Sequence, residues 1–426
     1  MSFTSVPYAG AFDLDPMRFS WCSVSPTKGF LVFSGNTAAP VTRKLFIQAV
    51  YFNGKAAPTF GPACAVGTLP FTGYLQLSMV SITDGRLVVT MKEDNTNFSY
   101  SVYDVDEADQ VSLAFKHPTL YAQPNGYEVP MVALNNNKVL STYLLDFNYN
   151  RFHTLTVGAT SLTVANTSTY GTIQCKATNG AAINSTPNIL LGTSIKRDRT
   201  GNIFIARAFA GPLYSTLLTH ATILTVFNKD GGFLYAGQLD PQTVGGLDAY
   251  GCQKGREILP IMQNIALNLG ATDVGGNGSV IGVNSFVKLT LGGTGDFRVV
   301  PEPPIAYRDT AGVLFHDAIW LDQDYFFALA TNTGSSPTYG GVRNGGSWSS
   351  TAGDFRATVA YIGKYNQDSN SIVMSDNMPL ALPCLIYHGS PVSNYLHKIS
   401  NTEVAILTIV RTAGNGFEFN VIVVGA

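Results

Sequence analysis

The chain has 426 residues, which is enough for two or three ordinary domains or for one large domain built from repeats. Hydrophobic residues make up 45% and charged residues only 13%, which favours a large core and excludes a disordered chain. The net charge of −2 gives no basic field that would attract a phosphate backbone, so we expect no nucleic-acid partner.

The beginning of the chain contains neither a basic segment nor an apolar segment of the kind found in secretory signal peptides. No apolar run approaches the roughly 18 residues that a membrane-spanning helix needs. We therefore expect a protein that is made in a cytoplasm, carries no signal peptide and does not insert into a bilayer.

Short apolar runs bounded by turn residues recur along the chain and predict β-strands. Each predicted unit has a turn, a very apolar strand, a polar turn and a second strand with more alternation. The seven units contain the strand pairs 30–33 and 44–52, 87–90 and 98–105, 138–145 and 151–157, 203–206 and 222–227, 285–291 and 297–300, 324–330 and 355–361, and 404–410 and 417–424. The best candidate helix is 259–269, where Pro260 would suit a first helical turn.

The spacing of these units predicts the fold class. Each unit spans roughly 62 residues, against about 40–50 for a typical propeller blade, and the longest predicted insertions are 270–282 and 331–353. A small sheet cannot bury both of its faces alone, whereas sheets packed around an axis can. We predict an all-β fold, a single β-propeller domain over 1–426 with about seven four-stranded blades. Tandem β-sandwich or jelly-roll domains are the alternative.

The last strand, 421–424, has no unit after it, so we expect it to pair with a strand near the N-terminus. The patterns Gly-Arg-Leu-Val-Val at 85–89 and Val-Tyr-Asp-Val-Asp at 102–106, with looser echoes elsewhere, resemble irregular β-propellers of bacteriophage and other virion proteins. The resemblance implies a structural protein of the virion, in a tail, collar or fibre. Its partners would then be other virion proteins and copies of itself.

The sequence contains no recognisable catalytic or metal-binding motif, so we expect no enzyme activity, no metal and no cofactor. The densest polar cluster, His316, Asp317, Trp320, Asp322 and Asp324, is interpreted as turn and surface residues. Asp104, Asp106 and Asp109 only loosely resemble calcium ligands, because the glycine and closing glutamate of an EF-hand loop are missing. The five cysteines are far apart and form no CxxC pair, so we expect buried thiols.

One polar, glycine-rich segment is typical of a binding loop. Residues 334–353 carry Tyr339, Arg343, Asn344 and Trp348, side chains that suit stacking on sugar rings or docking on another protein. The first alternative function is therefore binding of carbohydrate, for example a host surface glycan, or of a host receptor. The second is a glycoside hydrolase or lyase, which needs two carboxylates about 5–9.5 Å apart. Asp317, Asp322 and Asp324 are its best candidates.

Overall fold

The structure is a computed structural model of the chain, and it divides the chain into two compact units. The first comprises residues 1–172, 391–409 and 417–426, and the second 173–390 and 410–416. The residues described are 2–7, 19–36, 43–69, 77–83, 85–94, 96–122, 129–135, 137–146, 149–167, 189–214, 217–239, 242–244, 247–249, 258–262, 265–268, 272–273, 280–281, 285–292, 298–301, 305–306, 313–332, 355–356, 358–369, 371–375, 378–379, 384–385, 394–411 and 417–425.

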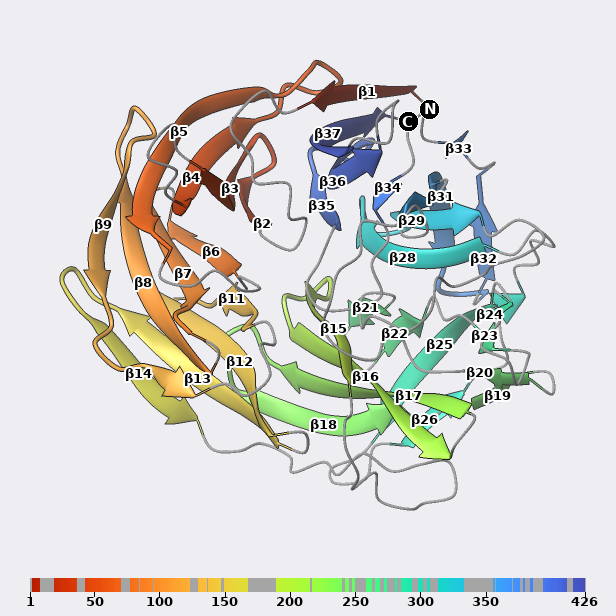
Figure 1. The fold of residues 1–426 in the computed structure, drawn as a ribbon. Coiled ribbons are helices and arrows are strands. Elements are labelled where there is room, and N and C mark those ends of the chain that lie inside the picture. The colour runs from red at the N-terminus through yellow and green to blue at the C-terminus, as the bar shows by residue number, and fades with distance from the viewer. Residues whose placement is uncertain are drawn as a thin grey trace. The chain divides into compact units, whose positions relative to one another are not determined.

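The fold is all-β and of the β-propeller class, with six four-stranded blades. Each blade is an antiparallel sheet formed by one stretch of the chain (Figure 1). No helix within the described residues is long and apolar enough to cross a membrane.

Three blades belong to the first unit. The first contains β2 (Phe19–Ser25), β3 (Lys28–Asn36), β4 (Arg43–Tyr51) and β5 (Thr59–Thr68). The second contains β6 (Leu77–Thr83), β7 (Arg86–Lys92), β8 (Asn97–Val105) and β9 (Val111–Lys116), with β10 (Tyr121–Ala122) added beside β8. The third contains β11 (Met131–Ala133), β12 (Lys138–Asp146), β13 (Tyr149–Val157) and β14 (Leu162–Thr167).

The other three blades belong to the second unit. The fourth contains β15 (Ile189–Arg197), β16 (Ile203–Tyr214), β17 (Leu217–Phe227) and β18 (Phe233–Leu239). The fifth contains β21 (Ile258–Met262), β22 (Ile265–Asn268), β25 (Ser285–Gly292) and β26 (Arg298–Pro301), with β27 (Ile305–Ala306) beside β25. The sixth contains β28 (Val313–Trp320), β29 (Tyr325–Asn332), β31 (Thr358–Asn366) and β32 (Ser371–Met374), with β33 (Met378–Pro379) beside β31.

The remaining strands form two sheets of another kind. One contains β19 (Gln242–Val244), β20 (Leu247–Ala249), β23 (Thr272–Asp273) and β24 (Val280–Ile281). The other combines β1 (Ser2–Pro7) with β37 (Phe417–Gly425), β36 (Glu403–Arg411) and β35 (Asn394–Lys398), and the short strands β30 (Phe355–Arg356) and β34 (Cys384–Leu385), which pair with each other, are assigned to it.

The predicted fold class is confirmed, but the predicted blade number of about seven is too high. The seventh predicted unit is not a blade drawn from one stretch of chain, because its sheet also takes up β1. The expected pairing between the two ends of the chain is confirmed, since Phe3 is opposite Val424 and Val6 is opposite Val421. The prediction of a single domain over 1–426 stays a prediction.

The candidate helix 259–269 is wrong, because this segment forms the strands β21 and β22. Leu259 is opposite Leu267 in the antiparallel pair. β21 is the edge strand of its sheet, where the missing N–H of Pro260 leaves no ladder partner unsatisfied. Leu259, Ile261 and Leu267 enter one apolar core, which tertiary packing favours over the local helical pattern.

Neighbouring blades share their apolar faces. In the first unit one core joins blades β2–β5 and β6–β9, and a second core joins β6–β9 and β11–β14. In β8 the side chains divide between the two cores, since Tyr103 belongs to the first, and Phe98, Tyr100 and Val102 to the second. This alternation is what a strand buried on both faces requires.

Asp and Asn side chains close several of the tight turns. An oxygen of Asp198 accepts the backbone N–H groups of Thr200 and Asn202, both at 2.8 Å. Asn228 binds the turn between β17 and β18 in the same way. Such bonds give the turn a local partner for N–H groups that the sheet does not use.

Gly29 of β3 lies under the Trp21 ring of β2. A methyl group at Gly29 would stand 2.1 Å from Cζ2 of Trp21, too close for any pair of carbon atoms. We expect Gly29→Ala to lower the free energy of unfolding by about 1–3 kcal/mol, since the ring must leave its packed position. Gly67→Ala is the matched control, because its methyl group would meet no atom within 4 Å. Equal unfolding midpoints for the two variants in urea would contradict this account.

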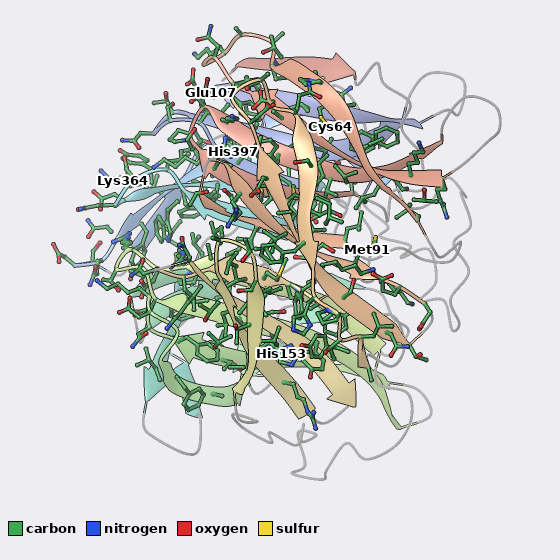
Figure 2. The ribbon with its side chains drawn as sticks, turned by 90° about the vertical axis from the view of Figure 1, so that its left-hand side faces the viewer. Cys64, Met91, Glu107, His153, Lys364 and His397 are labelled. Carbon is green, nitrogen blue, oxygen red and sulfur yellow. The ribbon has the colours of Figure 1, made fainter. Side chains whose placement is uncertain are left out.

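His397 of β35 is buried against the first blade (Figure 2). Its ring stacks on Phe52 at 4.6 Å between centroids and meets Trp21 edge-on at 5.3 Å. Nε2 lies 3.0 Å from the carbonyl oxygen of Pro26 and therefore donates to it, so Nδ1 is the unprotonated nitrogen. Burial lowers the pKa of His397 from 6.5 to about 4.

The lowered pKa makes stability depend on pH. The unfolded chain binds a proton at His397 near pH 6.5, and the folded chain binds one only near pH 4. The contribution of His397 to the free energy of unfolding is therefore complete above pH 6.5 and is lost as the pH falls from 6.5 towards 4. The loss amounts to about 3 kcal/mol. We expect His397→Gln to flatten the pH dependence of the unfolding midpoint between pH 7 and 4. Parallel profiles for variant and wild type would refute the assignment to His397.

Candidate functional site

The predicted binding residues Tyr339, Arg343, Asn344 and Trp348 lie outside the described residues. Their role in binding stays a prediction. The polar cluster on and after β28 is described, apart from the side chain of His316, and it is the strongest candidate site.

Asp317 and Lys196 form a buried ion pair between β28 and β15. Lys196 Nζ lies 2.7 Å from Asp317 Oδ1 and also donates to the carbonyl of Ala318 at 2.9 Å. Asp317 is only 8% exposed, and the register of β28 against β29 shifts between Phe315 and Asp317. Asp317 itself stays in the ladder opposite Leu329, and the ion pair holds its carboxylate in place.

The turn between β28 and β29 carries two further carboxylates. Asp322 Oδ1 accepts the backbone N–H groups of Asp324 at 2.8 Å and Tyr325 at 2.7 Å, so this carboxylate closes the turn. Asp324 is exposed, and within the described residues its carboxylate has no hydrogen bond or ion pair. The two acids are therefore held differently although they are only two residues apart.

Arg199 reaches this turn from the segment after β15. Its guanidinium carbon lies 4.3 Å from the centroid of the Trp320 ring, and its backbone N–H donates to the carbonyl of Ile261 in β21. Trp320 Nε1 donates to the carbonyl of Pro260 at 2.7 Å, which fixes the indole ring against the same strand. The three strands β15, β21 and β28 thus hold a cation on an aromatic face.

The charges around Arg199 are mostly acidic. Burial lowers the pKa of Arg199, while the negative charges of Asp324 and Asp322 oppose that shift. Tyr325 directly follows Asp324 in the chain and is 39% exposed. Nζ of Lys364, which is labelled in Figure 2, lies 5.3 Å from the centroid of the Tyr325 ring. We name the group Arg199, Trp320, Asp322, Asp324 and Tyr325 the turn patch.

The structure divides the predicted polar cluster into two parts. Asp317 lies three residues before Trp320 on the same strand, a distance of roughly 10 Å at the usual rise per residue. Asp322 and Asp324 share one turn with Trp320 beside them. The expectation that all of these residues are mere turn formers is thus too simple. Sequence reasoning missed Lys196 and Arg199, because no pattern links the turn at 198–202 to the turn at 321–324.

Two other polar clusters are satisfied internally. Tyr100 donates to Ser141 at 2.9 Å, and both nitrogens of His153 meet tyrosine hydroxyls, Nδ1 that of Tyr100 at 2.9 Å and Nε2 that of Tyr143 at 3.1 Å (Figure 2). These groups are buried, and burial raises the pKa of both tyrosines. We interpret this network as a means of fixing the packing of two blades.

The second cluster involves the loosely calcium-like aspartates. Asp109, in a left-handed conformation with φ of 59°, is bonded by the Tyr51 hydroxyl and pairs with Lys28 at 2.9 Å. Asp104 instead pairs with Arg86, and Asp106 closes its own turn. The described residues hold no group of three or more metal-type ligands.

Cys22 and Cys64 are buried free thiols, as expected for these two residues. Burial raises the pKa of Cys22 to about 12, so its thiol stays protonated at neutral pH. Cys175 and Cys252 lie outside the described residues, as does the side chain of Cys384.

No family model matches the chain, and no curated protein matches its sequence. Its fold is similar to that of an α-L-arabinanase from Penicillium chrysogenum complexed with arabinobiose, at 10% identity and a TM-score of 0.47 over 99% of this chain and 98% of that one. It is also similar to the NanB sialidase of Streptococcus pneumoniae, at 8% identity and a TM-score of 0.40 over 98% and 71%. A further similar structure is the WD40 domain of SCAP from fission yeast, at 9% identity and a TM-score of 0.38 over 99% and 94%.

These findings contradict two of the sequence predictions. The comparisons do not support the interpretation as a structural virion protein or the expectation that the chain is not an enzyme: two of the solved structures with a similar fold are an arabinanase and a sialidase. The expected virion location and virion partners stay predictions that no comparison supports. At these identities the likeness concerns the fold alone, so function has to be derived from the turn patch.

The ion pair Lys196–Asp317 gives a direct test of the site's construction. Lys196→Met removes the cation next to the largely buried carboxylate of Asp317, so we expect it to cost about 3–5 kcal/mol of unfolding free energy. The double variant Lys196→Met with Asp317→Leu should recover much of that loss. The exposed pair Arg86–Asp104 is the control, and Asp104→Asn should cost at most about 1 kcal/mol. A double variant no more stable than the single one would contradict a buried pair.

Proposed function

We propose that the chain is a glycoside hydrolase whose catalytic carboxylates are Asp322 and Asp324. The observation that carries the proposal is the turn patch itself, in which two carboxylates in different environments stand beside aromatic rings and a cation. Glycoside hydrolysis in most enzymes uses one carboxylic acid and one carboxylate on either side of the scissile bond. The two neighbouring acids of the turn supply this pair of groups.

The environments of the two acids assign their roles. The carboxylate of Asp322 accepts two backbone N–H groups, which stabilise its negative charge and make it the base or nucleophile. Asp324 is exposed and its carboxyl group accepts no such bond within the described residues, so this side chain can turn towards the leaving oxygen and we assign it the role of the acid. The charge of Arg199 acts on both acids.

The aromatic side chains supply the binding surface. Tyr325 is exposed beside Asp324, and Trp320 is half-buried with its indole ring fixed by Pro260. Sugar rings present apolar C–H faces that pack on such rings, while their hydroxyls bond to neighbouring carboxylates. A glycan lying along the turn would therefore place a glycosidic bond near Asp322 and Asp324.

The test uses substitutions that remove charge and keep shape. Asp322→Asn should preserve the turn, since Asn228 closes the turn between β17 and β18 through the same kind of bonds. We expect Asp322→Asn and Asp324→Asn each to reduce the release of reducing ends from a panel of glycans by at least about a hundredfold. Asp368→Asn, an exposed residue of another turn in the same blade, should leave hydrolysis unchanged.

Two outcomes would overturn the hydrolase proposal. One is hydrolysis that is retained in both folded Asp→Asn variants, which would place the chemistry elsewhere in the chain. The other is glycan binding by the wild type without any cleavage across the panel. That second result would favour the carbohydrate-binding alternative, and loss of binding in Tyr325→Ala would then locate the binding surface at the turn patch.

A further inference from the structure

Arg199 has two donor atoms that the protein does not use. Nε and Nη2 are both buried, and neither finds a hydrogen-bond acceptor in the described part of the chain. A buried donor without an acceptor destabilises the fold, and more so when it belongs to a charged group. Two such atoms on one side chain therefore need an explanation beyond packing.

The neighbouring acids do not occupy these donors. The charges of Asp324 and Asp322 act on Arg199, yet no ion pair joins either residue to it within the described residues. Asp322 Oδ1 is committed to the backbone of its own turn. The guanidinium is instead held by its face, against the ring of Trp320 at 4.3 Å.

The identity of the two atoms indicates what they bind. Nε and Nη2 are the two nitrogens whose N–H groups point along one edge of the guanidinium plane. A carboxylate accepts both in parallel, as a bidentate pair, which a hydroxyl or a single carbonyl cannot do. Stacking on Trp320 holds the guanidinium plane, and no acceptor within the described residues meets this edge.

We propose that Arg199 binds a carboxylate of the ligand, so that the turn patch is selective for acidic glycans such as those containing uronic acids. This inference rests on the proposed function for its site, because it assumes that a glycan lies along the same turn. Arg199 is then a specificity-determining residue. The ligand's carboxylate supplies the missing acceptor, and its sugar ring lies towards Asp322, Asp324 and Tyr325.

The burial of the two atoms adds a requirement. Since both are covered in this structure, a ligand reaches them only if the groups packed on Arg199 shift. Trp320 is the aromatic ring in contact with the guanidinium, so binding should change its environment. Its fluorescence therefore reports on carboxylate binding separately from any hydrolysis.

The experiment compares an oligosaccharide of uronic acids with the same oligosaccharide after reduction of its carboxyl groups. We expect the wild type to bind the acidic form roughly ten- to hundredfold more tightly in calorimetry. Arg199→Lys keeps the charge but loses the two parallel N–H donors, and Arg199→Gln loses both the charge and the donors. Both variants should therefore lose the preference for the acidic form. Arg197→Lys is the control from the same segment, because Nη1 of Arg197 already donates to the carbonyl of Gly201.

The outcomes separate this inference from the hydrolase proposal. Equal affinity of the wild type for the acidic and the reduced oligosaccharide would overturn the carboxylate site, even if both are cleaved. Retained preference in folded Arg199→Lys would do the same, since a point charge would then suffice. Arg199-dependent binding of the acidic form with no cleavage would uphold the carboxylate site and refute the hydrolase. A fluorescence change on binding that disappears in Trp320→Phe would support the assignment independently.

Discussion

Interior strands such as β3, β7 and β16 are buried on both faces, and the burial of both faces of a blade is the constraint on which the rest of the structure depends. An isolated four-stranded sheet would expose both faces to water, at a cost of about 25 cal/mol per Å² of apolar area. The chain meets this requirement by packing sheet on sheet, so that β8 supplies Tyr103 to one core and Phe98, Tyr100 and Val102 to the next. The turns then become the places where polar side chains can vary.

Polar groups inside this arrangement fall into two classes. Some are fully paired and fix the packing, as in the network of Tyr100, Ser141, His153 and Tyr143. Others are left partly unpaired at high cost, as are Nδ1 of His397 and the two nitrogens of Arg199. The paired groups have a structural role, whereas burial keeps His397 neutral down to about pH 4, and the two nitrogens of Arg199 are the donors to which we assign a ligand.

The absence of a catalytic motif is weak evidence against an enzyme, because glycoside hydrolysis needs only two acids and a few aromatic rings. The composition and the virion resemblance favoured a structural protein, and neither contains information on which side chains meet. The candidate site exists only in the tertiary structure, where Arg199 lies on the ring of Trp320 and feels the charges of Asp322 and Asp324. That meeting depends on three strands that are far apart in the sequence.

The sequence by itself determined the position of the strands that form continuous apolar runs. The apolar runs at 30–33, 87–90 and 203–206 lie inside β3, β7 and β16, interior strands whose two faces are both buried, which makes them continuous hydrophobic runs. The strand that precedes each of them, such as β2 or β6, was missed because an edge strand needs less apolar area and gives a weaker pattern. The pairing of β1 with β37 could be expected from the sequence, since a last strand without a successor needs a partner.

Only the tertiary structure decided that 259–269 is a hairpin, that the chain forms six blades rather than about seven, and which charges pair. In each case the deciding energy comes from contacts between residues distant along the chain, such as Lys196 with Asp317 and Leu259 with the core of the next blade. Local propensity and residue spacing predict where each strand lies but not which strands pack beside it. Long-range packing therefore determined both the candidate site and the number of blades.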